Sequence, residues 1–292
     1  MIKYIFNGIL SFLSLFSLRI NHAIGGSVGW LMFILPTQLR HIASINIAAC
    51  LPQHSTLEQQ RILKTSLIET GKALTEIGPL WKWRAQRIVP LVREVINEDA
   101  VQQAYKKGKG VIFVTPHLGC WEIAGLYAAS RYPMTTLYRP PRQMAIDPFI
   151  HAGRERTGTR LVAIDAKGIR NLYQALAKGE TIGVLPDQEP GEGSGVYAPF
   201  FGRPAYSMVL LSRLARKSKA AVFFAYCERL PKGQGYKLVF RTAPDEVYDK
   251  NIETSVQAVN QEVESCVLNL PEQYQWGYKR FRANPPGYDN LY

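Results

Sequence analysis

Short runs of apolar residues alternate with longer amphipathic segments along most of this chain. The run VIFVTP, residues 111–116, is apolar at consecutive positions, which is typical of a strand covered on both faces. Further strands are predicted at 134–140, 159–165, 181–188, 220–229 and 236–242. Helices are predicted from apolar spacing at 56–77, 99–110, 121–131, 146–158, 168–180, 206–219 and 251–269. This order predicts an α/β fold with a mostly parallel sheet flanked by helices.

The first 35 residues follow a different pattern and are predicted to form an N-terminal membrane-attached helix. Residues 4–35 are rich in Leu, Ile and Phe, but Arg19 and His22 interrupt them. One helix that spans the membrane and a helix that lies in its interface both fit, and a buried helical hairpin is a third interpretation. Basic residues follow this stretch, which favours a body on the cytoplasmic side. We therefore expect a membrane anchor at 1–35 and one folded domain at 36–292.

The charge balance points to an anionic partner. Lys and Arg number 35 against 23 Asp and Glu, a formal net charge of +12. Nucleic acid, a phospholipid surface, a phosphorylated ligand and an acidic protein would all suit such a chain. A hydrophobic fraction of 47% over 292 residues is enough for a sizeable core and excludes an intrinsically disordered chain.

The four cysteines lack the spacing of a metal site. No CxxC occurs, so a structural zinc site is not expected. Each cysteine lies among apolar residues and is predicted to be a small buried side chain. They are Cys50, Cys120, Cys227 and Cys266.

A histidine and a glutamate follow the predicted strand 111–116. His117 comes directly after it, and Glu122 falls in the first turn of the next predicted helix. In parallel sheets the chemistry lies at the carboxyl ends of the strands. Glu122 could accept a hydrogen bond from the imidazole and leave its other nitrogen free to take a proton. A structural histidine is the alternative, whereas a metal site is disfavoured because no second histidine lies near.

Two other predicted strands also end in charged residues. Arg139 and Arg142 follow one strand, and Arg154 lies in the helix after it. Asp187 ends another strand and opens a Gly- and Pro-rich loop with aromatic residues, at 185–207, of the kind that lines a pocket. Three strand ends of one sheet that carry His and Glu, Arg, and Asp together favour a functional site.

Together these motifs resemble the late acyltransferases of lipid A biosynthesis, the lauroyl and myristoyl transferase family. The resemblance covers nearly the whole chain: the apolar N-terminus, RHIASINIAACLP, TPHLGCWE, LYRPPR, GRERTG, PDQEPGEGSGVYAPFFGRPA and PEQYQWGYKRFRANPPG. A His-x4-Asp or -Glu element alone is shared with many glycerolipid acyltransferases, whereas the combination is specific to the lipid A branch. The stretch QEPGEG is individual to this chain and leaves acyl length and acceptor position open.

The resemblance implies a glycerolipid-acyltransferase-like fold and a transferase of the cell inner membrane, with an acyltransferase domain on the cytoplasmic side. Such an enzyme moves a fatty acyl chain from acyl carrier protein to a hydroxyl of a partly acylated Kdo-lipid A precursor. The family pattern implies that His117 and Glu122 are catalytic and that Arg154 and Asp187 are important for activity. We expect neither a metal nor a bound cofactor.

The candidate residues suit this reaction. A hydroxyl is a weak nucleophile, and a base such as His117 that removes its proton accelerates attack on a thioester by about 10²–10⁴-fold. Cys120 is expected to be packed beneath the turn, so direct transfer in a ternary complex is favoured over an acyl-enzyme. Arg139, Arg142 and Arg203 are candidates to bind phosphates of the precursor.

Other interpretations remain open at this point. A basic face within 212–219 would suit acidic acyl carrier protein, a phospholipid headgroup or solvent. A glycerolipid or other lyso-lipid acyltransferase would share the base and differ in the acceptor. A non-catalytic, basic nucleic-acid-binding membrane protein would explain the charge, but it gives no reason for His117 at a strand end. We therefore expect a lipid partner and no nucleic acid.

Overall fold

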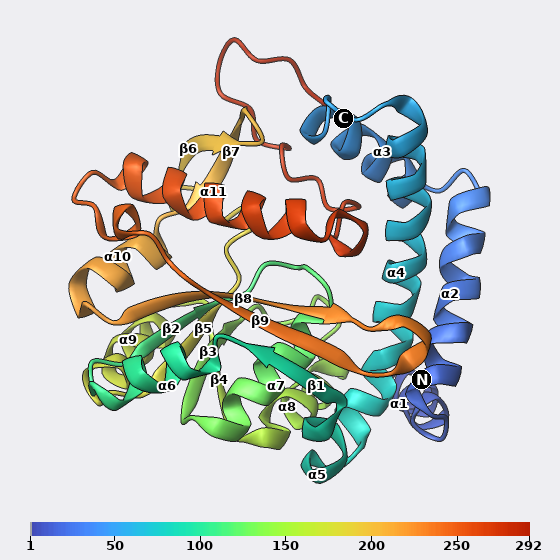
Figure 1. Cartoon of the computed structure of the whole chain (residues 1–292), viewed down its shortest axis with the longest axis horizontal. Coiled ribbons are helices and arrows are strands. Elements are labelled where there is room, and N and C mark those ends of the chain that lie inside the picture. The colour runs from blue at the N-terminus through green and yellow to red at the C-terminus, as the bar shows by residue number, and fades with distance from the viewer. Residues whose placement is uncertain (1) are drawn as a thin grey trace.

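The computed structural model describes residues 2–292, which form a seven-stranded sheet between helices, a two-stranded ribbon, and a group of N-terminal helices at one side (Figure 1). The helices are α1 (Ile2–Ser14), α2 (Leu18–Ile34), α3 (Gln38–Cys50), α4 (Thr56–Lys82), α5 (Ala85–Ile88), α6 (Glu98–Lys106), α7 (Trp121–Arg131), α8 (Asp147–Arg154), α9 (Ala166–Ala177), α10 (Leu210–Ser218) and α11 (Ile252–Asn269). The strands are β1 (Val92–Ile96), β2 (Val111–Val114), β3 (Met134–Tyr138), β4 (Thr159–Ala163), β5 (Thr181–Val184), β6 (Gly195–Phe200), β7 (Arg203–Met208), β8 (Ala221–Arg229) and β9 (Tyr236–Thr242).

The predicted parallel sheet is confirmed for its central part. The strand order is β1-β9-β8-β2-β5-β3-β4. Neighbouring strands from β8 to β4 are parallel, whereas β9 is antiparallel to β8 and β1 is parallel to β9. The sheet is therefore mostly parallel, with two strands of opposite direction at one edge.

The apolar run of β2 is explained by burial on both faces of the sheet. Ile112 and Val114 join the core formed with α9, α10 and α11, while Val111 and Phe113 join the core formed with α6 and α7. The chain leaves β2 through α7 on one face, and after β5 it reaches α10 on the other face. Adjacent strands whose connections diverge in this way leave a crevice at their carboxyl ends.

Several elements differ from the sequence prediction. The predicted helix at 206–219 is a helix only from Leu210, because the residues before it pair with β6 as an antiparallel ribbon. Phe201 and Gly202 both have positive φ and form the two-residue turn between β6 and β7. Strand β1 was not predicted, since it lies at the sheet edge, where its residues are half-buried or exposed and form no continuous apolar run.

The N-terminal helices pack against α4 through glycines. Gly25 and Gly29 of α2 face α4, and a Cβ at either position would overlap the backbone of α4. Gly71 of α4 meets α2 in the same way, so the two helices approach closely along this seam. Many apolar side chains of α1 and α2 nevertheless remain exposed, among them Ile5, Phe12, Ile24, Trp30, Leu31 and Ile34.

The spanning alternative for the N-terminus is not found in this structure. Between residues 2 and 292, no helix combines the length and the apolar character that crossing a membrane requires. Residues 4–35 instead contribute to two helices, α1 and α2, separated by a turn.

The glycine seam gives a first prediction. Gly29→Ala should lower the free energy of unfolding by about 1–3 kcal/mol, because the added methyl group must push α2 away from α4. The matched control is Gly26→Ala on the same helix, where the nearest atom to a Cβ is 3.8 Å away. That control should leave the melting temperature unchanged or raise it slightly. Equal melting temperatures for the two variants would contradict close packing at Gly29.

Candidate active site

His117 and Asp187 come together at the carboxyl ends of two adjacent strands. Strands β2 and β5 run parallel in register, and each is followed by a short segment that carries one of the two residues. The Asp187 carboxylate lies 2.8 Å from Nδ1 of His117 and accepts a second hydrogen bond, also 2.8 Å, from the His117 backbone N–H. His117 is thus held at two points, one on its ring and one on its backbone, and Nε2 is the ring nitrogen that Asp187 leaves for a reacting group.

Glu122 does not orient His117, contrary to the hydrogen bond expected from the sequence. Its carboxylate accepts hydrogen bonds from Arg154, including one of 2.9 Å from Nε, and one of 3.2 Å from the indole N–H of Trp81. Arg154 ends α8 and approaches the first turn of α7 with both Nε and Nη2. A bidentate guanidinium is a strong partner for a carboxylate, and Asp187 already occupies the imidazole.

Asp187 and Arg154 keep their charges although burial opposes both. Burial alone would raise the pKa of Asp187, but the charge of His117 and the hydrogen bonds that it donates outweigh this and lower the pKa. Burial likewise opposes the charge on Arg154, yet the Glu122 carboxylate outweighs it and raises the pKa of the guanidinium. The Asp187 side chain is 2% exposed and that of His117 is 14% exposed, so only the imidazole reaches the open side.

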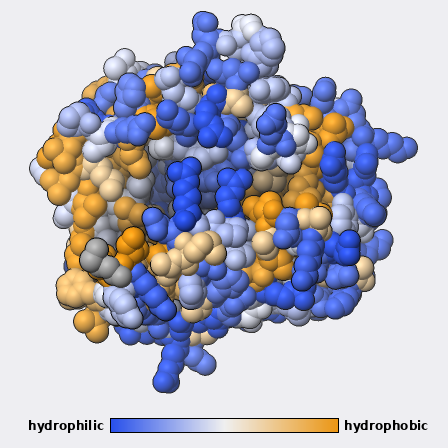
Figure 2. Space-filling view, turned by 180° about the vertical axis from the view of Figure 1, so that it is seen from behind, coloured by the Kyte–Doolittle hydropathy of each residue, from blue (hydrophilic) through white to orange (hydrophobic). Residues whose placement is uncertain are grey.

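His117 and the Glu122–Arg154 pair border an open cavity of about 640 Å³. Its wall includes His117, Glu122 and Arg154, and most of its other residues are apolar. The molecule seen from behind is hollowed near its centre, with hydrophilic residues at the rim and hydrophobic residues to both sides (Figure 2). A cavity of this size with a few polar groups at one end is typical of a small-molecule or lipid site.

The remaining predicted site residues divide between the cavity and other surfaces. Arg139 is exposed and lines the cavity. Arg142 is exposed but is not among the lining residues, and Arg203 lies half-buried on β7, also outside the lining. The structure therefore brings together four of the seven predicted residues, with Arg139 beside them.

Two residues of the site were missed by sequence reasoning. The Nε2 atoms of Gln188 and His117 are 3.3 Å apart. The position of Gln188 directly after Asp187 at a strand end could have indicated it. Trp81 donates to Glu122 from the end of α4, and its distance along the chain gave no signal.

Cys120 is buried beneath the turn, as predicted. Its side chain is 1% exposed, and burial raises the pKa of the thiol well above its ordinary value, with Glu76 adding to the effect. The other three cysteines are also buried and free. Among the described residues, no three His, Cys, Asp or Glu side chains gather as a metal site would require.

Comparison with known proteins agrees with the resemblance seen in the motifs. The lipid A biosynthesis lauroyltransferase of Escherichia coli (strain K12) is 28% identical over 93% of this chain and 88% of its own length. The lipid A biosynthesis palmitoleoyltransferase of the same strain is 30% identical over 86% of this chain and 81% of its own. A phosphatidylinositol mannoside acyltransferase of Mycolicibacterium smegmatis (strain ATCC 700084 / mc(2)155) is 27% identical over 46% of this chain and 45% of its own.

The family model described as bacterial lipid A biosynthesis acyltransferase matches residues 1–283. Since that match spans nearly the whole chain and includes every residue of the site, the chain belongs to this family and is an acyltransferase.

Proposed function

We propose that the protein transfers a fatty acyl chain from acyl carrier protein to a hydroxyl of a partly acylated Kdo-lipid A precursor, in a ternary complex. The observation that supports this most is the His117–Asp187 pair at the edge of a large, mainly apolar cavity. A base with a fixed tautomer serves to activate a hydroxyl, and an apolar cavity serves to hold a hydrocarbon chain.

In the proposed reaction, His117 acts as the general base. Its Nε2 removes the proton of the acceptor hydroxyl while that oxygen attacks the thioester carbonyl carbon. The Asp187 carboxylate holds the ring and stabilises the imidazolium that forms. Collapse of the tetrahedral intermediate breaks the carbon–sulfur bond, and the imidazolium returns its proton to the leaving thiolate. Every proton is therefore accounted for by one histidine, without a covalent enzyme intermediate.

The Glu122–Arg154 pair has a different role in this proposal. Glu122 acts in the site by fixing the guanidinium of Arg154 at the cavity wall, where Trp81 fixes the carboxylate in turn. A positioned cation can stabilise the negative oxygen of the intermediate, as can the backbone N–H groups at the start of α7. Arg139 at the cavity wall is available for a phosphate of the precursor.

One part of the cavity has the shape needed for an acyl chain. Thr136 of β3 pairs in register with Gly183 of β5 and Leu161 of β4, so these positions share the sheet face that α7 covers. Gly125 of α7 lines the same space, and a Cβ there would meet no atom within 4 Å. The absence of a side chain at Gly125 thus leaves room beside the sheet, where we place the chain of the donor.

The partners are inferred from two exposed surfaces. Helix α10 lines the cavity with Leu210 and exposes Arg213, Arg216 and Lys217, which suits the docking of acidic acyl carrier protein near the site. The exposed apolar side chains of α1 and α2 suit the interface of a membrane, which we propose is the cytoplasmic side of the inner membrane. Figure 2 shows hydrophobic residues along the side where these helices lie.

The function is tested by product analysis. The purified protein with acyl-loaded acyl carrier protein and the Kdo-lipid A precursor should yield a precursor heavier by one acyl chain in mass spectrometry. A lyso-phospholipid acceptor should react much more slowly. Preferred acylation of the lyso-phospholipid would instead support the second candidate, a lyso-lipid acyltransferase, for which the similarity to an acyltransferase of another lipid is the supporting observation.

The base assignment predicts a coupled pair. His117→Ala should lower kcat by at least about 10²-fold, and Asp187→Asn should lower it strongly because the imidazolium loses its counter-charge. The double variant should be little worse than the worse single variant, since the two residues act as one unit. His54→Ala, at a histidine just before α4 and outside the cavity, is the control and should keep full activity. A folded His117→Ala variant with near-native turnover would contradict the mechanism.

The acyl-chain assignment predicts a change in specificity. Gly125→Leu should shift the preferred donor to shorter chains, because each methylene excluded from the cavity forfeits about 0.8 kcal/mol, about fourfold in kcat/KM. Ser130→Leu, at an exposed position of the same helix, should leave the preference unchanged. Competition between donors of different length, read by mass spectrometry, measures the shift. An unchanged preference in Gly125→Leu would place the chain elsewhere.

A further inference from the structure

The turn that carries His117 is held by hydrogen bonds along its whole backbone. The carbonyl of His117 accepts from the N–H of Gln275 at 3.1 Å, and the N–H of Gly119 donates to the carbonyl of Gln273 at 3.0 Å. The N–H of Cys120 donates to the carbonyl of Cys227 at 2.7 Å. Two segments far along the chain, the end of β8 and the stretch after α11, therefore fix this turn.

The carbonyl of Gly119 is held differently, by a charged side chain. It accepts a hydrogen bond of 3.0 Å from Nη2 of Arg229, which lies at the end of β8. Gly119 has a φ of +60°, and a Cβ there would overlap the carbonyl of Cys227. The turn therefore packs closely against β8, and the guanidinium of Arg229 adds a hydrogen bond to this contact.

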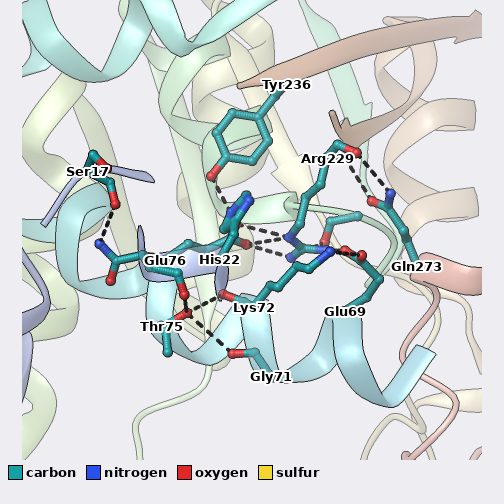
Figure 3. A network of polar contacts seen from close by, with 12 residues as sticks. Ser17, His22, Glu69, Gly71, Lys72, Thr75, Glu76, Arg229, Tyr236 and Gln273 are labelled. Carbon is teal, nitrogen blue, oxygen red and sulfur yellow. Dashed lines mark hydrogen bonds and ion pairs between the residues drawn. The ribbon is translucent and has the colours of Figure 1, made fainter. Parts of the chain in front are cut away.

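Arg229 is itself fixed by a buried network (Figure 3). Its Nε lies 3.0 Å from both carboxylate oxygens of Glu76, and Nη2 lies 2.6 Å from one of them. The same carboxylate accepts from the hydroxyl of Tyr236 at 2.9 Å and lies 3.1 Å from Nε2 of His22 on α2. The Arg229 and Glu76 side chains are 2% and 3% exposed, so the pair is almost completely shielded from water.

The location of this ion pair is informative because buried ion pairs contribute little net stability. The free energy needed to remove two charges from water is about as large as the free energy gained from their attraction. Proteins with apolar residues in place of such a pair are often as stable. Burial opposes the charge on Glu76, but Arg229 and His22 outweigh it and lower the pKa of the carboxyl. The pair thus stays charged, and Arg229 directs a further hydrogen bond to the turn that bears the base.

We propose that Arg229 is a positioning residue for His117. Glu76 holds Arg229 and His22 of α2 contacts Glu76, so helix α2 belongs to the same positioning network. Through the Gly119 carbonyl, Arg229 fixes the turn at the place where Asp187 can hold the imidazole. The inference rests on the proposed role of His117 as the base. A base displaced by about 1 Å can lose about 10²-fold in rate, so a clamp on its backbone affects turnover more than substrate binding.

Two variants separate positioning from simple stability. Arg229→Lys keeps the charge beside Glu76, but an ammonium cannot hold the carboxylate fork and the Gly119 carbonyl together. The double variant Glu76→Gln with Arg229→Met removes both charges at once, so neither member of the pair is left buried without its counter-ion. Arg241→Lys is the matched control, since Arg241 of β9 pairs with Glu262 of α11 away from the turn.

The first readout is amide hydrogen exchange of the turn, which needs no substrate. The peptide that contains Gly119 and Cys120 should exchange at least about tenfold faster in Arg229→Lys and in the double variant, while the rest of the core keeps its protection. Arg241→Lys should leave this peptide unchanged. Native-like exchange of the turn in both network variants would overturn the proposal, whatever the activity.

The second readout is acyl transfer at matched folded fraction. Both network variants should lose about 10–100-fold in kcat, with KM for donor and acceptor within about twofold of the native values. Faster exchange with native kcat would overturn the proposal, because the turn would then not control the base. If the native protein acylates no lipid precursor, the proposed function fails, whereas the exchange comparison still decides whether Arg229 holds the turn.

Discussion

The site depends on the parallel pairing of β2 with β5. Their register places the residues that follow Val114 and Val184 at one edge, and this brings His117 close to Asp187, with 2.8 Å between Nδ1 and the carboxylate, although the two are far apart along the chain. The same two strands send their connections to opposite faces of the sheet, which opens the crevice above them. A shift of register by one residue would move every side chain of β5 to the opposite face and separate the pair.

Two carboxylates lie within reach of this crevice, and each has its own hydrogen-bonding partner. Asp187 stands at the end of the neighbouring strand and meets the imidazole directly, with the backbone of His117 as a second donor. Glu122 stands on the first turn of α7, where the guanidinium of Arg154 and the indole of Trp81 approach from outside the sheet. Each carboxylate is thus hydrogen-bonded, as buried polar groups require.

Helix α2 contacts the protein core on one side and exposes apolar residues on the other. Its glycine seam and His22 face the interior, where they contact α4 and the carboxylate of Glu76. Its opposite side exposes apolar residues such as Trp30 and Leu31, which a water-facing helix would avoid. Because this helix contacts the core on one side and is apolar on its outer side, its sequence is apolar nearly throughout.

The sequence by itself determined the fold class, the central strands and the family, because continuous apolar runs and dense motifs are local properties of the chain. It also placed His117 and Asp187 at strand ends and Arg154 in the helix that follows another strand. Which carboxylate meets the imidazole, the antiparallel course of β9, and the clamp from Arg229 to Gly119 were decided by the tertiary structure. These contacts join residues separated by long stretches of chain, and the spacing of residues within one segment carries no information about them.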